Sequence, residues 1–183
     1  MSVIYLDMDG VIADFFGGIA KKCGVDHWKS IQDRDKIFVE LRNTEFFYTL
    51  DTFESGSFTR SISGSIVEYV KGLVWKNQMQ WGICSSPLRG DHNNSAYWKR
   101  RWLEDFGFMP PLIENCVFTS NKHKYAWNEV THRPNILVDD KPENIDAWNK
   151  AGGIGIRYQA NEDDLEEYLF VELEKAIERI RNW

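Results

Sequence analysis

The sequence predicts an α/β protein with a Rossmann-like, doubly wound parallel sheet and a small helical cap inserted after the first strand. Five short apolar runs rich in β-branched residues are separated by segments with helical character. Strands covered by helices on both faces have this apolar composition. The chain of 183 residues is long enough for one full core, and one long segment interrupts the alternation after the first run.

The predicted strands are short and separated by turn residues. Each of the last four follows a segment that we interpret as helical. They cover residues 3–9, 79–85, 116–120, 135–140 and 153–158.

Two helices have clear signals. In "PENIDAWNKAGG", Pro142 suits the first helical position, Ile145 and Trp148 share a face, and Gly152 ends the helix. Near the C-terminus, leucine and isoleucine recur at helical spacing from residue 165 to 180, and Asn161 could cap that helix.

Residues 15–58 contain helical pieces but no convincing strand, so we interpret them as a cap inserted into a core of residues 1–14 and 59–183. The cap ends in "ESGSFTRSISGS", whose serines and glycines suit a hinge.

The charge pattern argues against several classes of partner. The net charge is −6 and acidic and basic residues are interspersed, so no basic face is expected for a long nucleic acid or an anionic membrane.

No apolar run approaches the roughly 20 residues that span a bilayer, and the first strand begins almost at once. We therefore expect a cytoplasmic protein whose ligand is a small anion. The sequence does not indicate its oligomeric state.

Polar residues cluster where the predicted strands end. Ligands of open parallel sheets bind beyond the carboxyl ends of the strands. Here those ends carry Asp7 and Asp9, Ser85 and Ser86, Lys122, and Asp139 and Asp140.

These residues suit a metal and a phosphate. Asp7 and Asp9 leave the same face of a strand, with Cα atoms roughly 6.6 Å apart. With Asp139 and Asp140 they form an oxygen-rich cluster of the kind that binds Mg²⁺, which would offset the buried negative charge. A metal alone cannot balance several carboxylates and a phosphate, and Lys122 could supply the missing charge.

Ser85 and Ser86 offer hydroxyl and backbone donors for phosphate oxygens. The combination favours phosphoryl transfer, in which positioning and charge neutralisation supply most of the catalysis.

Four segments in order, "DMDGV", "ICSSP", "FTSNK" and "VDDKPENI", resemble the motifs of the haloacid dehalogenase (HAD) superfamily of phosphohydrolases. More narrowly, "DMDGVIADF", the insertion ending near "EFFYTL", and "ICSSP" resemble the 5'(3')-deoxyribonucleotidase family. The resemblance implies a Mg²⁺-dependent enzyme that hydrolyses nucleoside monophosphates through an aspartyl phosphate.

The resemblance also implies roles for individual residues. Asp7 matches the nucleophile, and Asp9 matches the general acid and base, whose carbonyl helps to hold Mg²⁺. Ser85 matches a phosphate-binding residue and Lys122 the neutralising lysine, although Lys124 is close enough to compete.

Two further features follow from the same comparison. Asp139 and Asp140 match the metal-binding acidic pair, with Asp140 favoured as the direct ligand. Lys141 stands where the family often has arginine, which leaves the contact from that position open.

The cap aromatics allow two interpretations. Phe15, Phe46 and Phe47 match the region that closes over the base, where an aromatic ring stacks on a nucleobase. They could equally form the small core that fixes the cap to the main domain. The run "WKRRW" at residues 98–102 predicts an exposed helical face, since acidic residues flank it.

Three other functions share parts of this pattern. A HAD phosphatase could act on sugar phosphates or on 3'-phosphate ends of nucleic acid, although the acidic balance disfavours the latter. A non-catalytic phosphoacceptor or nucleotide-binding protein would use the same groups without turnover. Signalling receiver domains place the acidic pair first and the phosphoacceptor later, opposite to the order found here.

Overall fold

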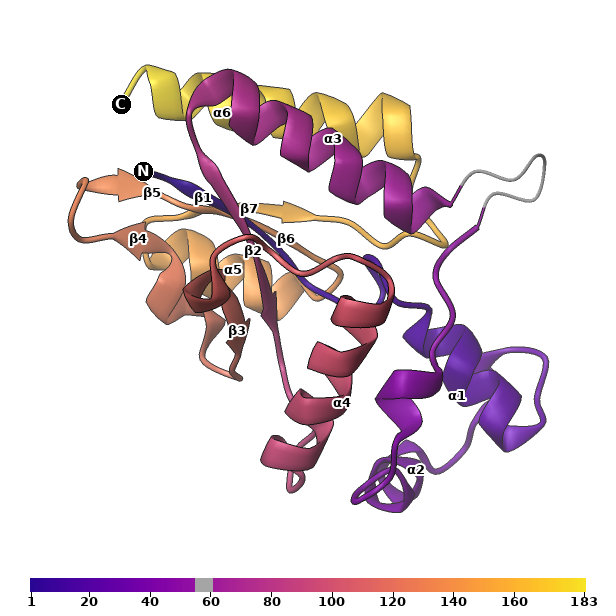
Figure 1. Cartoon of the computed structure of the whole chain (residues 1–183). Coiled ribbons are helices and arrows are strands. Elements are labelled where there is room, and N and C mark those ends of the chain that lie inside the picture. Colours follow the sequence, from indigo (N-terminus) through magenta and orange to yellow (C-terminus); the bar gives the residue numbers. More distant parts are fainter. Residues whose placement is uncertain (55–60) are drawn as a thin grey trace.

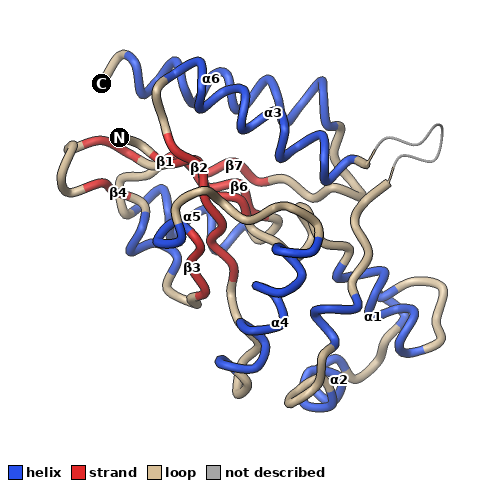
Figure 2. Tube along the Cα trace, viewed as in Figure 1, coloured by secondary structure: helices blue, strands red, loops and turns tan. Residues whose placement is uncertain are grey.

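A five-stranded parallel sheet forms the centre of the computed structural model, which describes residues 1–54 and 61–183. Its order is β3-β2-β1-β6-β7. Figure 2 shows the strands as a layer between helices. The predicted α/β class is confirmed, and the strands span Val3–Leu6 (β1), Gln80–Ser85 (β2), Cys116–Phe118 (β3), Ile136–Asp139 (β6) and Ile154–Arg157 (β7).

The central strand β1 has all four residues buried and pairs on both sides, with Leu6 opposite Ile83 of β2 and Val138 of β6. Alternate residues of β1 face two different hydrophobic clusters, because side chains alternate across a strand. Ile4 and Leu6 belong to the larger cluster, and Val3 and Tyr5 to the smaller one.

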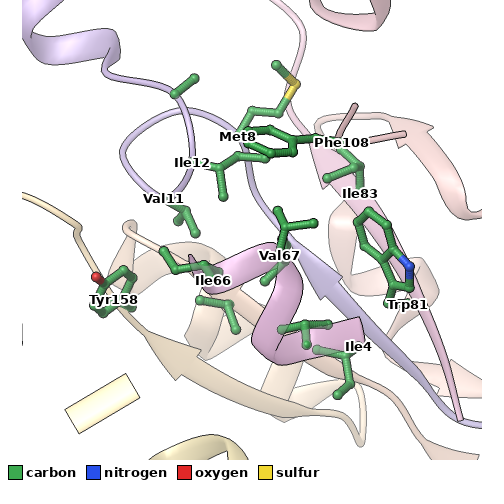
Figure 3. Close-up of a cluster of buried hydrophobic side chains, with 14 of the residues drawn as sticks. Ile4, Met8, Val11, Ile12, Ile66, Val67, Trp81, Ile83, Phe108 and Tyr158 are labelled. Atoms are coloured by element: carbon green, nitrogen blue, oxygen red, sulfur yellow. The ribbon is translucent and has the colours of Figure 1, made fainter. Parts of the chain in front are cut away.

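Helices cover both faces of the sheet. On one face, α3 (Ile62–Asn77) and α6 (Val171–Arg181) lie side by side, and α5 (Pro142–Lys150) covers the other (Figure 1). The larger cluster includes Ile4 of β1 and Ile66 and Val67 of α3, so part of it lies between the sheet and α3 (Figure 3). The predicted helix with Pro142 at its start is present, and a fourth helix, α4, spans His92–Asp105.

The described part of the segment between β1 and α3 contains several helices and lies below and to the right of the sheet in Figure 1. It contains α1 (Phe15–Cys23), α2 (Arg34–Glu40) and the 3-10 helices Trp28–Ser30 and Phe46–Thr49. The predicted boundary between residues 58 and 59, with the centre of the predicted hinge, lies outside the described residues.

Hydrogen bonds join this cap to α4 and the turn before it. The Trp102 indole donates to the Leu50 carbonyl at 2.7 Å, and the Asn43 backbone N–H donates to Asp91 at 3.0 Å. The Asn94 amide donates to the Thr44 carbonyl at 2.9 Å. The cap is therefore held by the helix that follows β2 and by the turn that leads into it.

Two predicted features are wrong in detail. Between β3 and β6, where every residue is described, there is no α-helix; a 3-10 turn (Lys122–Tyr125) leads instead to an antiparallel pair, β4 (Trp127–Asn128) and β5 (Arg133–Pro134). The C-terminal helix is capped by Asp164, which accepts from the Glu167 N–H, and not by Asn161. It begins as a π-helix, Leu165–Phe170, and continues as α6.

Among the described helices, none combines the length and the apolar composition needed to cross a bilayer.

Truncating a buried side chain of α3 should destabilise the protein. Val67 is 0% exposed within the larger cluster and Val130 is 90% exposed. We expect Val67→Ala to lower the free energy of unfolding by about 2 kcal/mol, because apolar contacts are lost and a cavity remains. Val130→Ala, the same chemical change on the surface, should leave it unchanged in urea unfolding. Equal effects of the two variants would contradict this packing.

Candidate active site at the carboxyl edge of the sheet

The first acidic motif follows β1 directly and is held by backbone hydrogen bonds. The Asp7 N–H donates to the Val138 carbonyl at 2.9 Å, and the Asp7 side chain accepts from the Met8 N–H at 2.7 Å. Gly10 has a φ of +82°, and a Cβ there would lie 2.9 Å from the Asp140 carboxylate. Glycine is needed at this position because of both its backbone conformation and the close approach of the second acidic motif.

Lys122 bridges the carboxyl ends of β1 and β6. Its Nζ lies 3.0 Å from Asp7 Oδ2 and 2.6 Å from Asp139 Oδ2, and all three side chains are buried. Burial disfavours the ammonium form, but the two carboxylates outweigh this and raise the pKa of Lys122. Lys124, the alternative considered from the sequence, is exposed.

The ammonium groups also act on Asp7. Burial opposes its ionisation, yet Lys122 and then Lys99 hold its pKa below the ordinary value. Asp7 is only 4% exposed, and because its pKa is lowered its buried carboxylate is ionised.

The two members of the acidic pair have different surroundings. Both oxygens of Asp139 are occupied, because Lys122 donates to Oδ2, the Lys141 N–H donates to Oδ1 at 2.9 Å, and the Asn144 amide contacts both at 3.0 Å. The contact from position 141, which the sequence left open, is therefore made by the backbone N–H of Lys141 to Asp139.

Asp140, by contrast, has a buried oxygen, Oδ1, without a hydrogen-bond partner among the described residues. Burial, and then repulsion by Asp7 and Asp139, raise the pKa of Asp140 to about 8. Its oxygens come within 4.8 Å of those of Asp7 and Asp139. An unsatisfied, buried, oxygen-only cluster fits a hard divalent cation, and Asp140 and Asp7 are its best-suited ligands.

A second buried ammonium, that of Lys99 in α4, lies beside Asp9. Its Nζ lies 2.7 Å from Asp9 Oδ2, 3.0 Å from the Ser85 hydroxyl and 2.8 Å from the Ser86 carbonyl. Lys99 is 0% exposed. The other oxygen of Asp9 is buried without a partner in the described part of the chain.

The expectation that residues 98–102 form an exposed helical face is therefore wrong for Lys99 and Trp102. The buried residues of α4 recur every three or four positions, at Ser95, Lys99, Trp102 and Leu103. This spacing is visible in the sequence and places Lys99 on the buried face. The charged composition of residues 98–102 instead led to the expectation of an exposed face.

The other predicted phosphate-binding residues lie at the end of β2. Ser85 is buried, and Ser86 is half-buried with its carbonyl directed at Lys99. The structure thus brings together Asp7, Asp9, Ser85, Ser86, Lys122, Asp139 and Asp140, and it adds Lys99.

The three predicted cap aromatics contact one another. Phe15 stacks on Phe47 at 6.0 Å between centroids and meets Phe46 edge-on at the same distance. Phe46 and Phe47 are buried, and Phe15 is half-buried. The ring of Phe47 also lies 4.7 Å below the Lys99 ammonium, so this cluster borders the charged groups.

Comparison with curated proteins finds similar sequences. The chain is 27% identical over 151 residues to the human mitochondrial 5'(3')-deoxyribonucleotidase, covering 76% of this chain and 62% of that protein. It is 26% identical over 157 residues to the mouse (Mus musculus) protein of the same name, covering 76% and 64%. The chain thus spans less than two thirds of the length of these relatives.

Comparison with solved structures finds a hydrolase from Pseudomonas syringae, with 13% identity, a TM-score of 0.49, and coverage of 96% of this chain and 89% of that one. No family model matches the sequence.

The raised pKa of Asp140 should make the metal-free protein less stable as pH rises. The folded state holds this proton up to about pH 8, whereas an unfolded aspartate loses it near pH ~4. Over that interval the folded state binds more protons, so the free energy of unfolding falls with pH. In EDTA, Asp140→Asn should raise the melting temperature at pH 8 by a few degrees, roughly 2–4 °C per kcal/mol, and much less at pH 4.

The matched control is Asp146→Asn, which removes an exposed carboxylate from α5. Calorimetry at both pH values should find little change in the control. If Asp140→Asn gave the same shift at pH 4 as at pH 8, the raised pKa would be contradicted.

Proposed function

We propose that this protein is a Mg²⁺-dependent phosphomonoesterase that hydrolyses nucleoside monophosphates, of the 5'(3')-deoxyribonucleotidase type, through an aspartyl phosphate. The observation that supports it most is the meeting of acidic groups from β1 and β6 with two buried ammonium groups at one edge of the sheet. The sequence similarity to two deoxyribonucleotidases points to the same chemistry.

Asp7 is the proposed nucleophile. Its carboxylate is ionised, and the Met8 N–H and Lys122 fix its orientation, so one oxygen can attack phosphorus while the ester oxygen departs. The attack forms the Asp7 acyl phosphate and breaks the bond between phosphorus and the ester oxygen.

Asp9 is the proposed general acid and base. Lys99 binds Oδ2, which leaves Oδ1 to hold the proton that passes to the departing oxygen. The deprotonated Oδ1 then takes a proton from water, whose oxygen attacks phosphorus and releases phosphate and free Asp7.

The two lysines and the metal neutralise charge. Four carboxylates (Asp7, Asp9, Asp139, Asp140) face two ammonium groups, and a phosphate adds further negative charge. When bound by Asp7 and Asp140, Mg²⁺ would supply two positive charges and polarise the phosphoryl group. Lys122 and the Ser85 hydroxyl would contact the phosphate oxygens.

The cap would enclose the nucleoside. Phe47 of the cap contacts the Lys99 ammonium and stacks on Phe15. The nucleoside of a substrate whose phosphate is bound near Lys99 would therefore lie beneath this aromatic cluster. Stacking on a base would require the exposed part of Phe15, since Phe46 and Phe47 are packed against their neighbours.

The substrate class is tested by phosphate release from deoxyribonucleotides, ribonucleotides and sugar phosphates, either with added Mg²⁺ or with EDTA. Faster release from deoxyribonucleoside monophosphates, and only with the metal, is the expected result. Preference for sugar phosphates would favour the broader HAD phosphatase function, and binding without turnover would favour a phosphoacceptor or nucleotide-binding protein.

Asp7→Asn should retain the fold and lose turnover by about 10³-fold or more, because an amide cannot form the acyl phosphate. Phosphate release and the melting temperature are measured together. Asp146→Asn on the surface is the control. Activity of Asp7→Asn near that of the control would remove the proposed nucleophile.

Lys99 and Lys122 should each be needed for turnover, while Lys124 should not. We expect Lys99→Ala and Lys122→Ala to lower kcat by roughly 10²-fold or more, because each leaves a carboxylate unpaired and removes charge near the phosphate. Lys124→Ala, an exposed lysine of the same loop as Lys122, is the control. Full activity of Lys99→Ala in a folded protein would exclude Lys99 from the site.

A further inference from the structure

A cavity lies beside the first half of α3 and the start of the C-terminal helix, and none of the candidate active-site residues lines it. Its volume is about 540 Å³, within the range of small-molecule sites. Tyr69 of α3 stacks on Phe170 at 3.7 Å between ring centroids, and both rings line the cavity with Ile62 and Leu165. The cavity thus has an apolar, aromatic wall.

The buried hydroxyl of Tyr158 is the first sign of a ligand. Tyr158 follows β7 and lines the cavity; it is 0% exposed, and its hydroxyl has no hydrogen-bond partner among the described residues. Figure 3 shows this ring at the margin of the hydrophobic cluster, with the oxygen directed away from it. A buried hydroxyl without a partner costs free energy that a ligand atom could recover.

Carboxylates surround the same cavity. Asp163 pairs with Arg157 at 2.6 Å, Glu68 pairs with Lys71 at 2.7 Å, and Asp164 caps the π-helix. Glu166 and Glu167 have no ion pair within residues 1–54 and 61–183. The local charge is therefore negative.

The spacing of these acids excludes a compact metal site. Among the described residues, the only group of acidic oxygens close enough to share one ion is that of Asp7, Asp139 and Asp140. Acids that line a cavity of this size without converging suit a ligand with several separated positive charges. The apolar part of the ligand between these charges would contact the aromatic wall.

We propose that this cavity binds an aliphatic polyamine. Its ammonium groups would pair with Glu166 and Glu167 and donate to the Tyr158 hydroxyl, and its methylene groups would lie against Tyr69 and Phe170. π-Helical turns are common at functional sites, and Leu165–Phe170 forms one wall of the cavity.

The cavity also adjoins the catalytic edge through the backbone. The Tyr158 N–H donates to the Asp139 carbonyl at 3.0 Å, and the Ala160 N–H donates to the Gly10 carbonyl at 2.9 Å. Both Tyr158 and Ala160 line the cavity.

The test is calorimetric titration of the full chain with spermidine, without nucleotide, in EDTA and at constant ionic strength. We expect saturable binding. Glu166→Gln with Glu167→Gln should weaken it at least tenfold, whereas Glu114→Gln with Glu129→Gln, an equal charge change at exposed sites, should not. Tyr158→Phe should weaken it at least threefold without lowering the melting temperature, because the lost hydroxyl has no partner.

Asp140→Asn serves as the control for the catalytic acids and should bind spermidine as the unaltered protein does. Absence of saturable binding, equal losses in the two glutamate pairs, or loss of binding in Asp140→Asn would overturn the proposal. Unchanged affinity of Tyr158→Phe would also overturn it.

Discussion

The buried contact of Lys122 with Asp7 and Asp139 is the interaction on which the rest of the site depends. Two carboxylates from adjacent central strands would repel each other in a region that excludes water, and removing one partner of a buried ion pair is strongly destabilising. The ammonium group allows β1 and β6 to end side by side with Asp7 ionised. Because the parallel strands β1 and β6 both end at this edge, the remaining polar groups at their ends meet there too.

Because of this contact, the neighbouring residues Asp139 and Asp140 differ in how many hydrogen bonds their carboxylates accept. Asp139 uses its oxygens to hold Lys122, Asn144 and the Lys141 N–H, which leaves it little capacity for a metal. Asp140 has a raised pKa and an oxygen without a hydrogen-bond partner in the described part of the chain, so of the two it is better suited to bind a cation. Gly10 permits this arrangement, since a side chain at that position would meet the Asp140 carboxylate.

The strands and the edge at which they end could be predicted because apolar runs and polar strand ends are local signals. The five predicted strands match those of the sheet to within a few residues, and the polar groups that follow them meet as expected.

Lys99 could not be placed in this way, since it reaches the site from a helix and its charged neighbours indicated an exposed face. The short pair β4 and β5 has only two residues in each strand, too few for a periodic pattern. The predicted cap, Asn161, and the actual cap, Asp164, are both good capping residues, so only tertiary packing distinguishes them.

Helix α4 connects the cap with the charged groups at the carboxyl edge of the sheet. One face carries Lys99 to Asp9 and Ser85, and Trp102, one turn later, holds the cap by its hydrogen bond to Leu50. Lys99 also contacts Phe47 of the cap, so its ammonium group touches both parts of the molecule. A displacement of the cap relative to α4 would alter the surroundings of this ammonium and, through it, of the Asp9 carboxylate. The surroundings of the Asp9 carboxylate therefore depend on how the cap is seated, although no cap residue contacts the carboxylate through a hydrogen bond within the described residues.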